Sequence, residues 1–353
     1  MTIIFAILLF SLLIFVHELG HFVAAKASGV RVNEFAMFMG PAIFKKQIGE
    51  TTYSLRCIPI GGYCAMEGEN EDTDDPRAFF KATWWKKFII LVAGSFMNLV
   101  TGFVLFAIVF APVKEYVIPV IESAEPGCTI VSEDGLHIGD EILELDGEKI
   151  YVQSDFSVLL SLNPGDTHDV VVRRNGKIVK LDDFVMEKHL FTNEDGEERE
   201  LYGINFGIKQ ATFGDKVELV WNSALNVVRN VRLSLQMLIT GQAGLSDMSG
   251  PVGIVGVMSE SAAAARNTWD AVLNMLYIGA FLAINLAVMN LLPIPALDGG
   301  RVVGLLLTTV IEAITRKKLS GKVEGYIHAV GMVLLLGLMA LILFKDIFAI
   351  FKG

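Results

Sequence analysis

The chain has 353 residues, of which 53% are hydrophobic and only 19% are charged, and its formal net charge is −10 at pH 7. A soluble protein carries about 25% charged residues, so this composition excludes a wholly soluble protein and indicates a membrane protein. The negative charge argues against nucleic acid as a partner. The three cysteines cannot form a disulfide framework and lack the C-x-x-C spacing of a zinc ribbon.

The first apolar run, from Ile3 to Ala27, contains the sequence His17-Glu18-Leu19-Gly20-His21. On a helix, residues four apart project from one face, one turn apart, so the two imidazoles form half of a zinc site. Glu18 lies beside them and could act as a base on water at that metal. The alternative is that the histidines only pack against neighbouring helices. We favour the metal site because ionisable groups cost at least about 2.5 kcal/mol each at the centre of a membrane helix.

A cleaved signal peptide is the alternative interpretation of this first run. Ala25-Lys26-Ala27 loosely resembles a cleavage site, but no basic residue precedes the apolar run. Cleavage there would also discard the two-histidine motif. We therefore expect the segment to remain in the protein.

Four apolar segments are long enough to cross a membrane, which takes about 20 residues: residues 3–25, 88–111, 272–296 and 326–344. The stretches 26–87 and 299–325 are rich in lysine and arginine, so the positive-inside rule places both in the cytoplasm. Residues 113–270 and both termini then lie outside. His21 precedes Lys26 by five residues, so the motif lies roughly 7–8 Å inside the cytoplasmic face.

The stretch after the first span reads as extended structure. Thr51–Leu55 is strand-like, and the chain is expected to turn at Gly61-Gly62 and run back as a hairpin. This hairpin is either an ordinary loop or an exposed edge that pairs with an unwound substrate. The acidic run Glu67–Asp75 that follows is interpreted as a solvated surface.

Residues 115–210 read as one small soluble domain. Turn signals alternate with short apolar strands, and an Asn175-Gly176 turn predicts a hairpin. The pattern from Gly139 to Gly147 resembles a PDZ domain, which binds an extended chain end along a strand edge. We interpret the histidines of this region as surface residues: His137, His168 and His189. Residues 216–240 have apolar residues at helical spacing but include arginines, which favours a helix on the membrane surface.

The third predicted span ends in an unusual sequence that holds Asn285, Asn290, Pro293, Pro295 and Asp298. The two prolines remove amide donors and open the helix, and free carbonyls at membrane depth are tolerated where they line a cavity. Asp298 falls at about the level of the histidines, where its carboxylate can complete a His-His-Asp site with a fourth position for water. The alternative is that it caps the following helix. Beside a motif that lacks a third ligand, we favour ligation.

These residues together resemble the site-2 protease family. The matching motifs are residues 15–21 and residues 290–300, and the PDZ-like insert is similar to the family's RseP/RasP branch of bacterial regulated intramembrane metalloproteases. Gly61-Gly62-Tyr63 and residues 249–254 also resemble that branch, and the single PDZ-like domain is similar to the Gram-positive type. The family's second-span motif usually has Gly-Pro where this chain has Gly94-Ser95. Asn98 still matches, although a lone asparagine there can equally join helices by hydrogen bonds.

We therefore expect an α-helical polytopic membrane protein with four transmembrane helices, an inserted PDZ-like α+β domain and a cytoplasmic-side β-hairpin. The expected divisions are the first two spans with the hairpin, the PDZ-like domain, a surface helix with its loop, and the last two spans, at residues 1–112, 113–212, 213–269 and 270–353. The protein is expected in the bacterial cell membrane, with both termini and the PDZ-like domain extracytoplasmic.

The resemblance implies an intramembrane zinc metalloprotease that cleaves within or near transmembrane segments of trimmed membrane proteins, such as anti-sigma factors or signal-peptide remnants. It implies one Zn²⁺ per chain, held by His17, His21 and Asp298, with Glu18 as the base. It also implies a PDZ domain that filters substrates by size. The residues implied to handle substrate are Gly61, Gly62, Tyr63, Asn98, Asn285, Asn290, Pro293 and Pro295.

The rival interpretation is a non-catalytic, PDZ-containing membrane scaffold with a structural metal. Glu18 argues against it, because a purely structural site needs no base.

Overall fold

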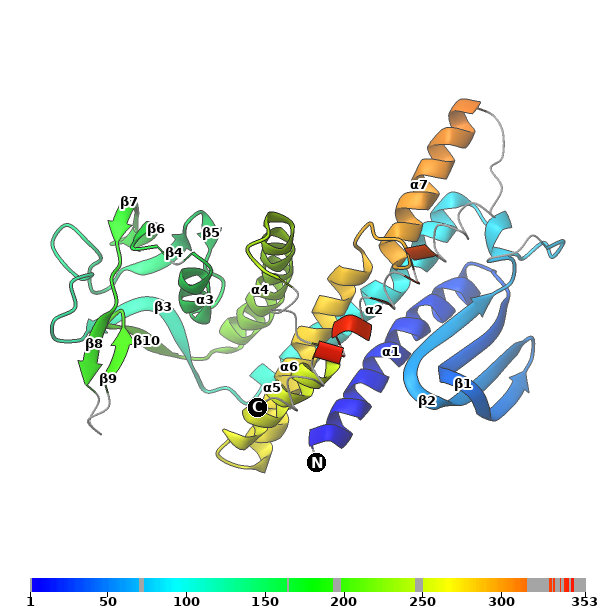
Figure 1. Cartoon of the computed structure of the whole chain (residues 1–353), viewed down its shortest axis with the longest axis horizontal. Coiled ribbons are helices and arrows are strands. Elements are labelled where there is room, and N and C mark those ends of the chain that lie inside the picture. Colours follow the sequence, from blue (N-terminus) through cyan, green and yellow to red (C-terminus); the bar gives the residue numbers. More distant parts are fainter. Residues whose placement is uncertain are drawn as a thin grey trace. The chain divides into compact units, whose positions relative to one another are not determined.

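The computed structural model describes residues 2–69, 73–163, 165–192, 198–244, 250–315 and scattered helical positions between 330 and 345. The chain forms two compact units, one made of Met1–Val109 with Val227–Gly353 and the other of Phe110–Asn226 (Figure 1). The first unit is mainly helical and carries a β-hairpin, whereas the second is built on a β-sheet. The predicted combination of apolar helices with an inserted β-rich region is therefore confirmed at this level.

Three helices among the described residues are long and apolar enough to cross a membrane: α1 (Thr2–Ala27), α2 (Trp84–Phe110) and α6 (Thr268–Asn290). They correspond to the first three predicted spans. The third prediction extends too far, because α6 ends at Asn290 and not at residue 296. A proline lacks the amide donor and disfavours helical geometry in the residue before it, so Pro293 prevents the helix from continuing. The fourth predicted span, residues 326–344, lies largely outside the described residues.

The helices of the first unit pack through an apolar core. One buried cluster joins α1 and α6 to the short helix α5 (Pro251–Ala263), and it includes Leu9, Leu13, Met258, Met275 and Ala283. Gly250 precedes the start of α5, and Pro251 occupies its first turn, where no amide donor is required.

The hairpin consists of β1 (Val32–Ile48) and β2 (Thr51–Met66), and its turn is at Gly49-Glu50. The turn between the two strands, where Gly49 supplies the positive φ of 62° that a tight turn needs, was not predicted. The reversal predicted around Gly61-Gly62 is present within the second strand, which doubles back around the first. Phe35 pairs with both Tyr53 and Cys64, so the chain changes direction between those two residues, in the region that contains the glycine pair.

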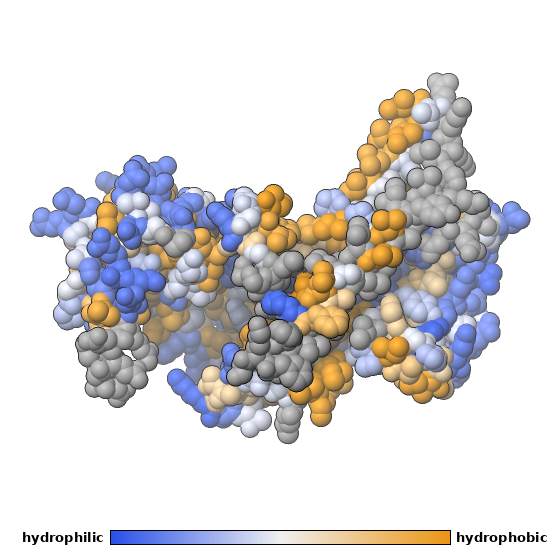
Figure 2. Space-filling model, viewed as in Figure 1, coloured by the Kyte–Doolittle hydropathy of each residue, from blue (hydrophilic) through white to orange (hydrophobic). Residues whose placement is uncertain are grey.

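Residues 299–325 were expected to be a cytoplasmic loop, and a helix that follows Asp298 was given only as the alternative role of that residue; α7 (Asp298–Thr315) occupies the first part of the stretch. The prediction gave weight to the basic residues and overlooked apolar residues at helical spacing. Leu305 is buried in a cluster that includes Phe79 of η1 (Phe79–Lys81) and Met66 at the end of the hairpin. Other apolar side chains of α7 are exposed: Leu306, Leu307, Val310 and Ile314. Figure 2 shows hydrophobic surface, in orange, along this helix.

The second unit is a six-stranded sheet with the order β10-β3-β4-β6-β7, in which β5 pairs with β4. Its elements are β3 (Glu115–Ala124), β4 (Glu141–Leu145), β5 (Glu148–Lys149), α3 (Ser154–Leu162), β6 (Thr167–Arg174), β7 (Lys177–Val185) and β10 (Ile204–Gln210). A separate pair is formed by β8 (His189–Thr192) and β9 (Glu198–Leu201). The predicted Asn175-Gly176 hairpin turn is confirmed, since both residues have positive φ and join β6 to β7. Helix α4 (Phe213–Thr240) covers the predicted 216–240 helix.

The interpretation of His168 as a surface residue was wrong. Its side chain is buried, and its ring nitrogens contact Asp146 Oδ2 at 2.8 Å and the Gly165 carbonyl oxygen at 3.0 Å. Partial burial of Asp146 works to raise the pKa of that carboxyl, but hydrogen bonds from His168 and Asn163 hold it below its usual range. The histidine lies inside the domain because its two ring nitrogens both have partners there.

Candidate metal centre

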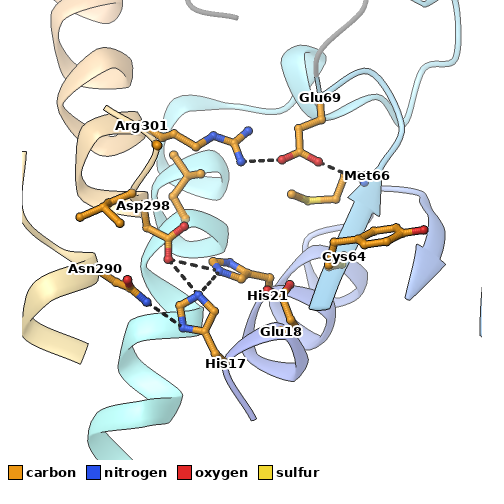
Figure 3. Close-up of a pocket in the computed structure, with 13 residues that line it drawn as sticks. His17, Glu18, His21, Cys64, Met66, Glu69, Asn290, Asp298 and Arg301 are labelled. Atoms are coloured by element: carbon orange, nitrogen blue, oxygen red, sulfur yellow. Dashed lines mark hydrogen bonds and ion pairs between the residues drawn. The ribbon is translucent and has the colours of Figure 1, made fainter. Parts of the chain in front are cut away.

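The two-histidine motif and the distant aspartate lie together in the first unit. His17 and His21 project from α1 one turn apart, and Asp298 is the first residue of α7 (Figure 3). Asp298 Oδ2 lies 3.3 Å from the Nε2 atom of each histidine, and the two Nε2 atoms are 3.2 Å apart. The three side chains are only 11–16% exposed. Two imidazoles and one carboxylate form a donor set that suits zinc with one coordination position left open.

Two further observations test whether this group fits a metal ion. Asp298 Oδ2 is buried and has no hydrogen-bond partner, although it faces both imidazoles. Gly94 of α2 lies directly beside the histidines, and a Cβ at that position would be 2.3 Å from His21 Nε2. A buried carboxylate oxygen that lacks a donor, next to a space kept free of any side chain, fits a cation held among these atoms.

The outer nitrogens of both histidines have neighbours that orient the rings. His21 Nδ1 donates to the carbonyl oxygen of Ile90 at 2.8 Å, which leaves its Nε2 facing the centre. His17 Nδ1 lies 3.4 Å from the amide nitrogen of Asn98 and 3.5 Å from that of Asn290. Asn98 Oδ1 is buried without a partner, and a half-turn of that amide would let this oxygen accept from His17 Nδ1–H.

The turn between α6 and α7 brings Asp298 to the histidines. Ile294 N donates to Leu292 O at 2.7 Å within this turn, and Ala296 has a φ of 83°. The carbonyls of the turn pack against the first turn of α7, where a Cβ on Gly299 or Gly300 would come within 2.3 Å of a carbonyl oxygen. Both interpretations of Asp298 thus have a structural counterpart, since the residue begins a helix and also faces the two imidazoles.

A cavity of about 320 Å³ opens beside this group. Its lining residues are His17, Glu18, His21, Tyr63, Cys64, Met66, Glu69, Leu91, Asn290, Ala296, Leu297, Asp298 and Arg301. Glu18 faces the end of β2, where a Cβ on Gly62 would be 3.2 Å from Glu18 Cγ. The last residues of the hairpin therefore run along the cavity beside the proposed base.

The other residues expected to handle substrate have different positions. Tyr63 and Asn290 line the cavity, and Asn98 contacts His17 from α2. Gly61 packs against Met39, and Pro295 lies against Gly331. Only Tyr63 and Asn290 of the eight predicted residues line the cavity; the other six do not: Gly61, Gly62, Asn98, Asn285, Pro293 and Pro295.

Sequence reasoning missed several residues of the cavity. The acidic run was interpreted as solvated, yet Glu69 is only 14% exposed and pairs with Arg301. Arg301 follows Asp298 by three residues, so recognition of α7 as a helix would have placed both on one face. Nothing in the sequence distinguishes Cys64, Met66 or Leu91 from ordinary core residues.

These helices and this donor set are those of an integral membrane metalloenzyme. Residues 5–338 match the sequence profile of peptidase family M50, and the chain therefore belongs to this family, the site-2 proteases, and is an intramembrane zinc metalloprotease. It is 36% identical to a predicted zinc metalloprotease of Clostridium perfringens, over 98% of each chain. It is 33% identical to one of Fusobacterium nucleatum, over the whole of both chains. The zinc metalloprotease RasP of Oceanobacillus iheyensis is 27% identical over 99% of each chain.

Proposed function

We propose that this protease cleaves peptide bonds within or next to the transmembrane helices of membrane proteins that have already been trimmed outside the membrane. The observation that carries the proposal is the convergence of His17, His21, Asp298 and Glu18 on one cavity among helices apolar enough to lie in a bilayer. Anti-sigma factors and signal-peptide remnants belong to this class of substrate. The relative named RasP, which matches along its whole length, supports the assignment.

In this proposal His17, His21 and Asp298 hold zinc and Glu18 is the base. Zinc in this position supplies a Lewis acid that polarises the scissile carbonyl and lowers the pKa of water. Glu18 takes a proton from the attacking water and returns it to the leaving amine. Asn98 and Asn290 are positioned to keep the His17 ring in place through its Nδ1 atom.

The substrate must be unwound before it can be cut, because a helix hides its carbonyl groups in i to i−4 hydrogen bonds. The segment of β2 from Gly62 to Met66 runs beside Glu18 and pairs with β1 on one side. We propose that it holds the substrate in extended form by strand addition. The further residues proposed to handle substrate are Gly61, Tyr63, Asn98, Asn285, Asn290, Pro293 and Pro295.

The proposed topology has four membrane spans, the fourth at residues 326–344, with both termini outside and the active site near the cytoplasmic face. The lysines and arginines that flank the spans support this orientation. The proposed divisions are residues 1–112, 113–212, 213–269 and 270–353. Residues 113–212 form a PDZ-like extracytoplasmic domain in this proposal, and it admits only substrates whose outer part has been removed.

The decisive experiment compares the wild type with Glu18→Gln in membrane vesicles that contain a single-span substrate. Glutamine cannot accept the proton, so cleavage should disappear while bound zinc remains, because Glu18 is not a ligand. Zinc is measured by mass spectrometry on the purified proteins. Cleavage by Glu18→Gln at the wild-type rate would refute the role of Glu18, and its loss of zinc would mean that base and ligand had been misassigned. The scaffold alternative predicts no cleavage by the wild type.

A further inference from the structure

Outside the metal-binding atoms, the cavity contains one ion pair that joins two distant parts of the chain. Arg301 Nη1 donates to Glu69 Oε1, as Figure 3 shows, and the two side chains are 23% and 14% exposed. Glu69 follows the last residue of β2 by three positions, and Arg301 follows Asp298 by three positions on α7. The pair therefore connects the end of the hairpin with the first turn of the helix that begins at Asp298.

Each partner also has a second contact that fixes its position. The other oxygen of Glu69, Oε2, accepts from the backbone nitrogen of Met66 at 3.2 Å, so the carboxylate holds the end of β2 directly. The Arg301 guanidinium lies over the ring of Phe79, 5.7 Å from its centroid. Met66 and Phe79 belong to the same buried cluster as Leu305 of α7, so the ion pair stands at the edge of an apolar contact between the same elements.

The chemistry of the pair excludes two other roles. A guanidinium has no lone pair to offer a metal ion and remains protonated, so Arg301 is neither a ligand nor a base. Glu69 has both oxygens occupied by donors, which leaves it poorly suited to take a proton from water. The opposite charges of Glu69 and Arg301 also cancel, so the pair adds no net charge to the cavity. What remains is its geometry, since it joins the helix of the third metal-binding residue to the strand beside Glu18.

We propose that Glu69 and Arg301 are a positioning pair that sets Asp298 against His17 and His21 and, through the same contact, sets the end of β2 along the cavity. The inference depends on the proposed function, in which Asp298 is a ligand. Metal sites require their donor atoms within about 0.2 Å of the ideal distance, and residues that orient a ligand typically change metal affinity about 10–100-fold when replaced. Asp298 comes from a part of the chain far from the histidines in sequence, so its position needs such a support.

The test measures zinc affinity of the full-length protein in detergent, by competition with a chromophoric zinc chelator. Glu69→Gln and Arg301→Gln should each lower the affinity about 10–100-fold while the thermal unfolding midpoint changes little. Because both side chains act through one contact, their effects should not add. The zinc affinity of the double variant should be no lower than that of whichever single variant binds zinc less tightly. Arg77→Gln is the matched control, because Arg77 also pairs with a glutamate, Glu50, but is 50% exposed and does not line the cavity. Its zinc affinity should equal that of the wild type.

Several outcomes would overturn the inference. Wild-type zinc affinity in both glutamine variants would do so, and so would additive losses in the double variant. A raised KM for substrate with unchanged zinc affinity would show that Arg301 binds substrate. If a glutamine variant does not fold, Arg301→Lys decides, because lysine keeps the charge without the forked geometry. Zinc affinity near that of the wild type in that variant supports the pair, because lysine can still donate to Glu69 Oε1, and a loss as large as that expected for the glutamine variants refutes it. A wild type that binds no zinc would instead refute the proposed function.

Discussion

Gly94 offers a sharp test of the metal centre, because the structure gives the size of the perturbation directly. A Cβ at this position would lie 2.3 Å from His21 Nε2 and 2.8 Å from His17 Cε1, whereas ordinary contact begins at 3.4 Å. In Gly94→Ala the His21 ring must therefore move by about 1.1 Å, or α2 must move away from α1 by a similar amount. The shift is several times the tolerance of about 0.2 Å for zinc-donor distances.

The expected result is a loss of zinc affinity of at least a hundredfold, with a similar loss of cleavage, since a misplacement of about 1 Å costs about 10²-fold in rate. Zinc is measured by mass spectrometry and by chelator competition, and folding by thermal unfolding in detergent. Gly102→Ala is the control on the same helix. Its Cβ would lie 2.4 Å from Ile284 Cγ1 and would disturb the packing of α2 against α6, away from the histidines. It should lower stability but keep zinc. Wild-type zinc affinity in Gly94→Ala would refute the placement of the metal.

Three further predictions concern the third ligand, the second unit and the substrate filter. Asp298→Asn should bind zinc at least tenfold more weakly, because an uncharged amide is a poorer zinc ligand than a carboxylate. If this variant kept full zinc content and activity, Asp298 would not be a ligand and its role would be limited to starting α7. In the second unit, burial works to raise the pKa of Asp140, but hydrogen bonds from Arg174 and His137 N hold it below its usual range. This stabilisation is present above the unfolded pKa of about 3.9 and is lost as the pH falls through the lower folded pKa. Arg174→Met should therefore destabilise the sheet by about 3–5 kcal/mol at pH 7 and by less in acid. The measurement is hydrogen exchange of the β4 and β6 amides, and an equal loss of stability at both pH values would contradict this reasoning. Deletion of residues 115–210 should let the enzyme cut an untrimmed substrate as well as its truncated form, and a folded deletion enzyme that cuts only the truncated form would place the filter elsewhere.

The sequence predicts most of the elements that carry chemistry, because spacing on a helix is a local property. His17 and His21 share a face in any helix, and the first three apolar segments are long enough to identify as spans. The β6–β7 turn follows from Asn175-Gly176, whose conformation is set by those two residues. Each of these predictions depends on a few neighbouring residues.

The parts that were missed depend on contacts between distant residues. The sequence offers one turn at Gly49-Glu50 and another near the glycine pair at 61–62, and the chain uses both. Only the pairing of Phe35 with Tyr53 and with Cys64 shows this, and those pairings join residues that are distant in sequence. The sequence suggested a helix here only as the alternative in which Asp298 caps it, because the basic residues at 316–318 and 322, beyond the end of α7, predicted a cytoplasmic stretch. The relation between Asp298 and Arg301 was therefore missed. Glu69 looked solvated because its partner lies more than 200 positions away in the chain. His168 looked exposed because its partner Asp146 is contributed by another turn.

The position of Asp298 is where these distant contacts meet. The carbonyls of the α6–α7 turn lie against Gly299 and Gly300, Pro295 of that turn lies against Gly331, and Arg301 binds Glu69. None of these contacts involves a histidine, yet each limits where the first turn of α7 can lie. A carboxylate on one helix can bind a metal that is held by residues of another helix only if the two helices cannot slide or rotate relative to each other. Substitutions at these contacts should therefore weaken zinc binding before they unfold the protein, whereas a ligand held by a local turn would lose zinc only when the turn itself is changed.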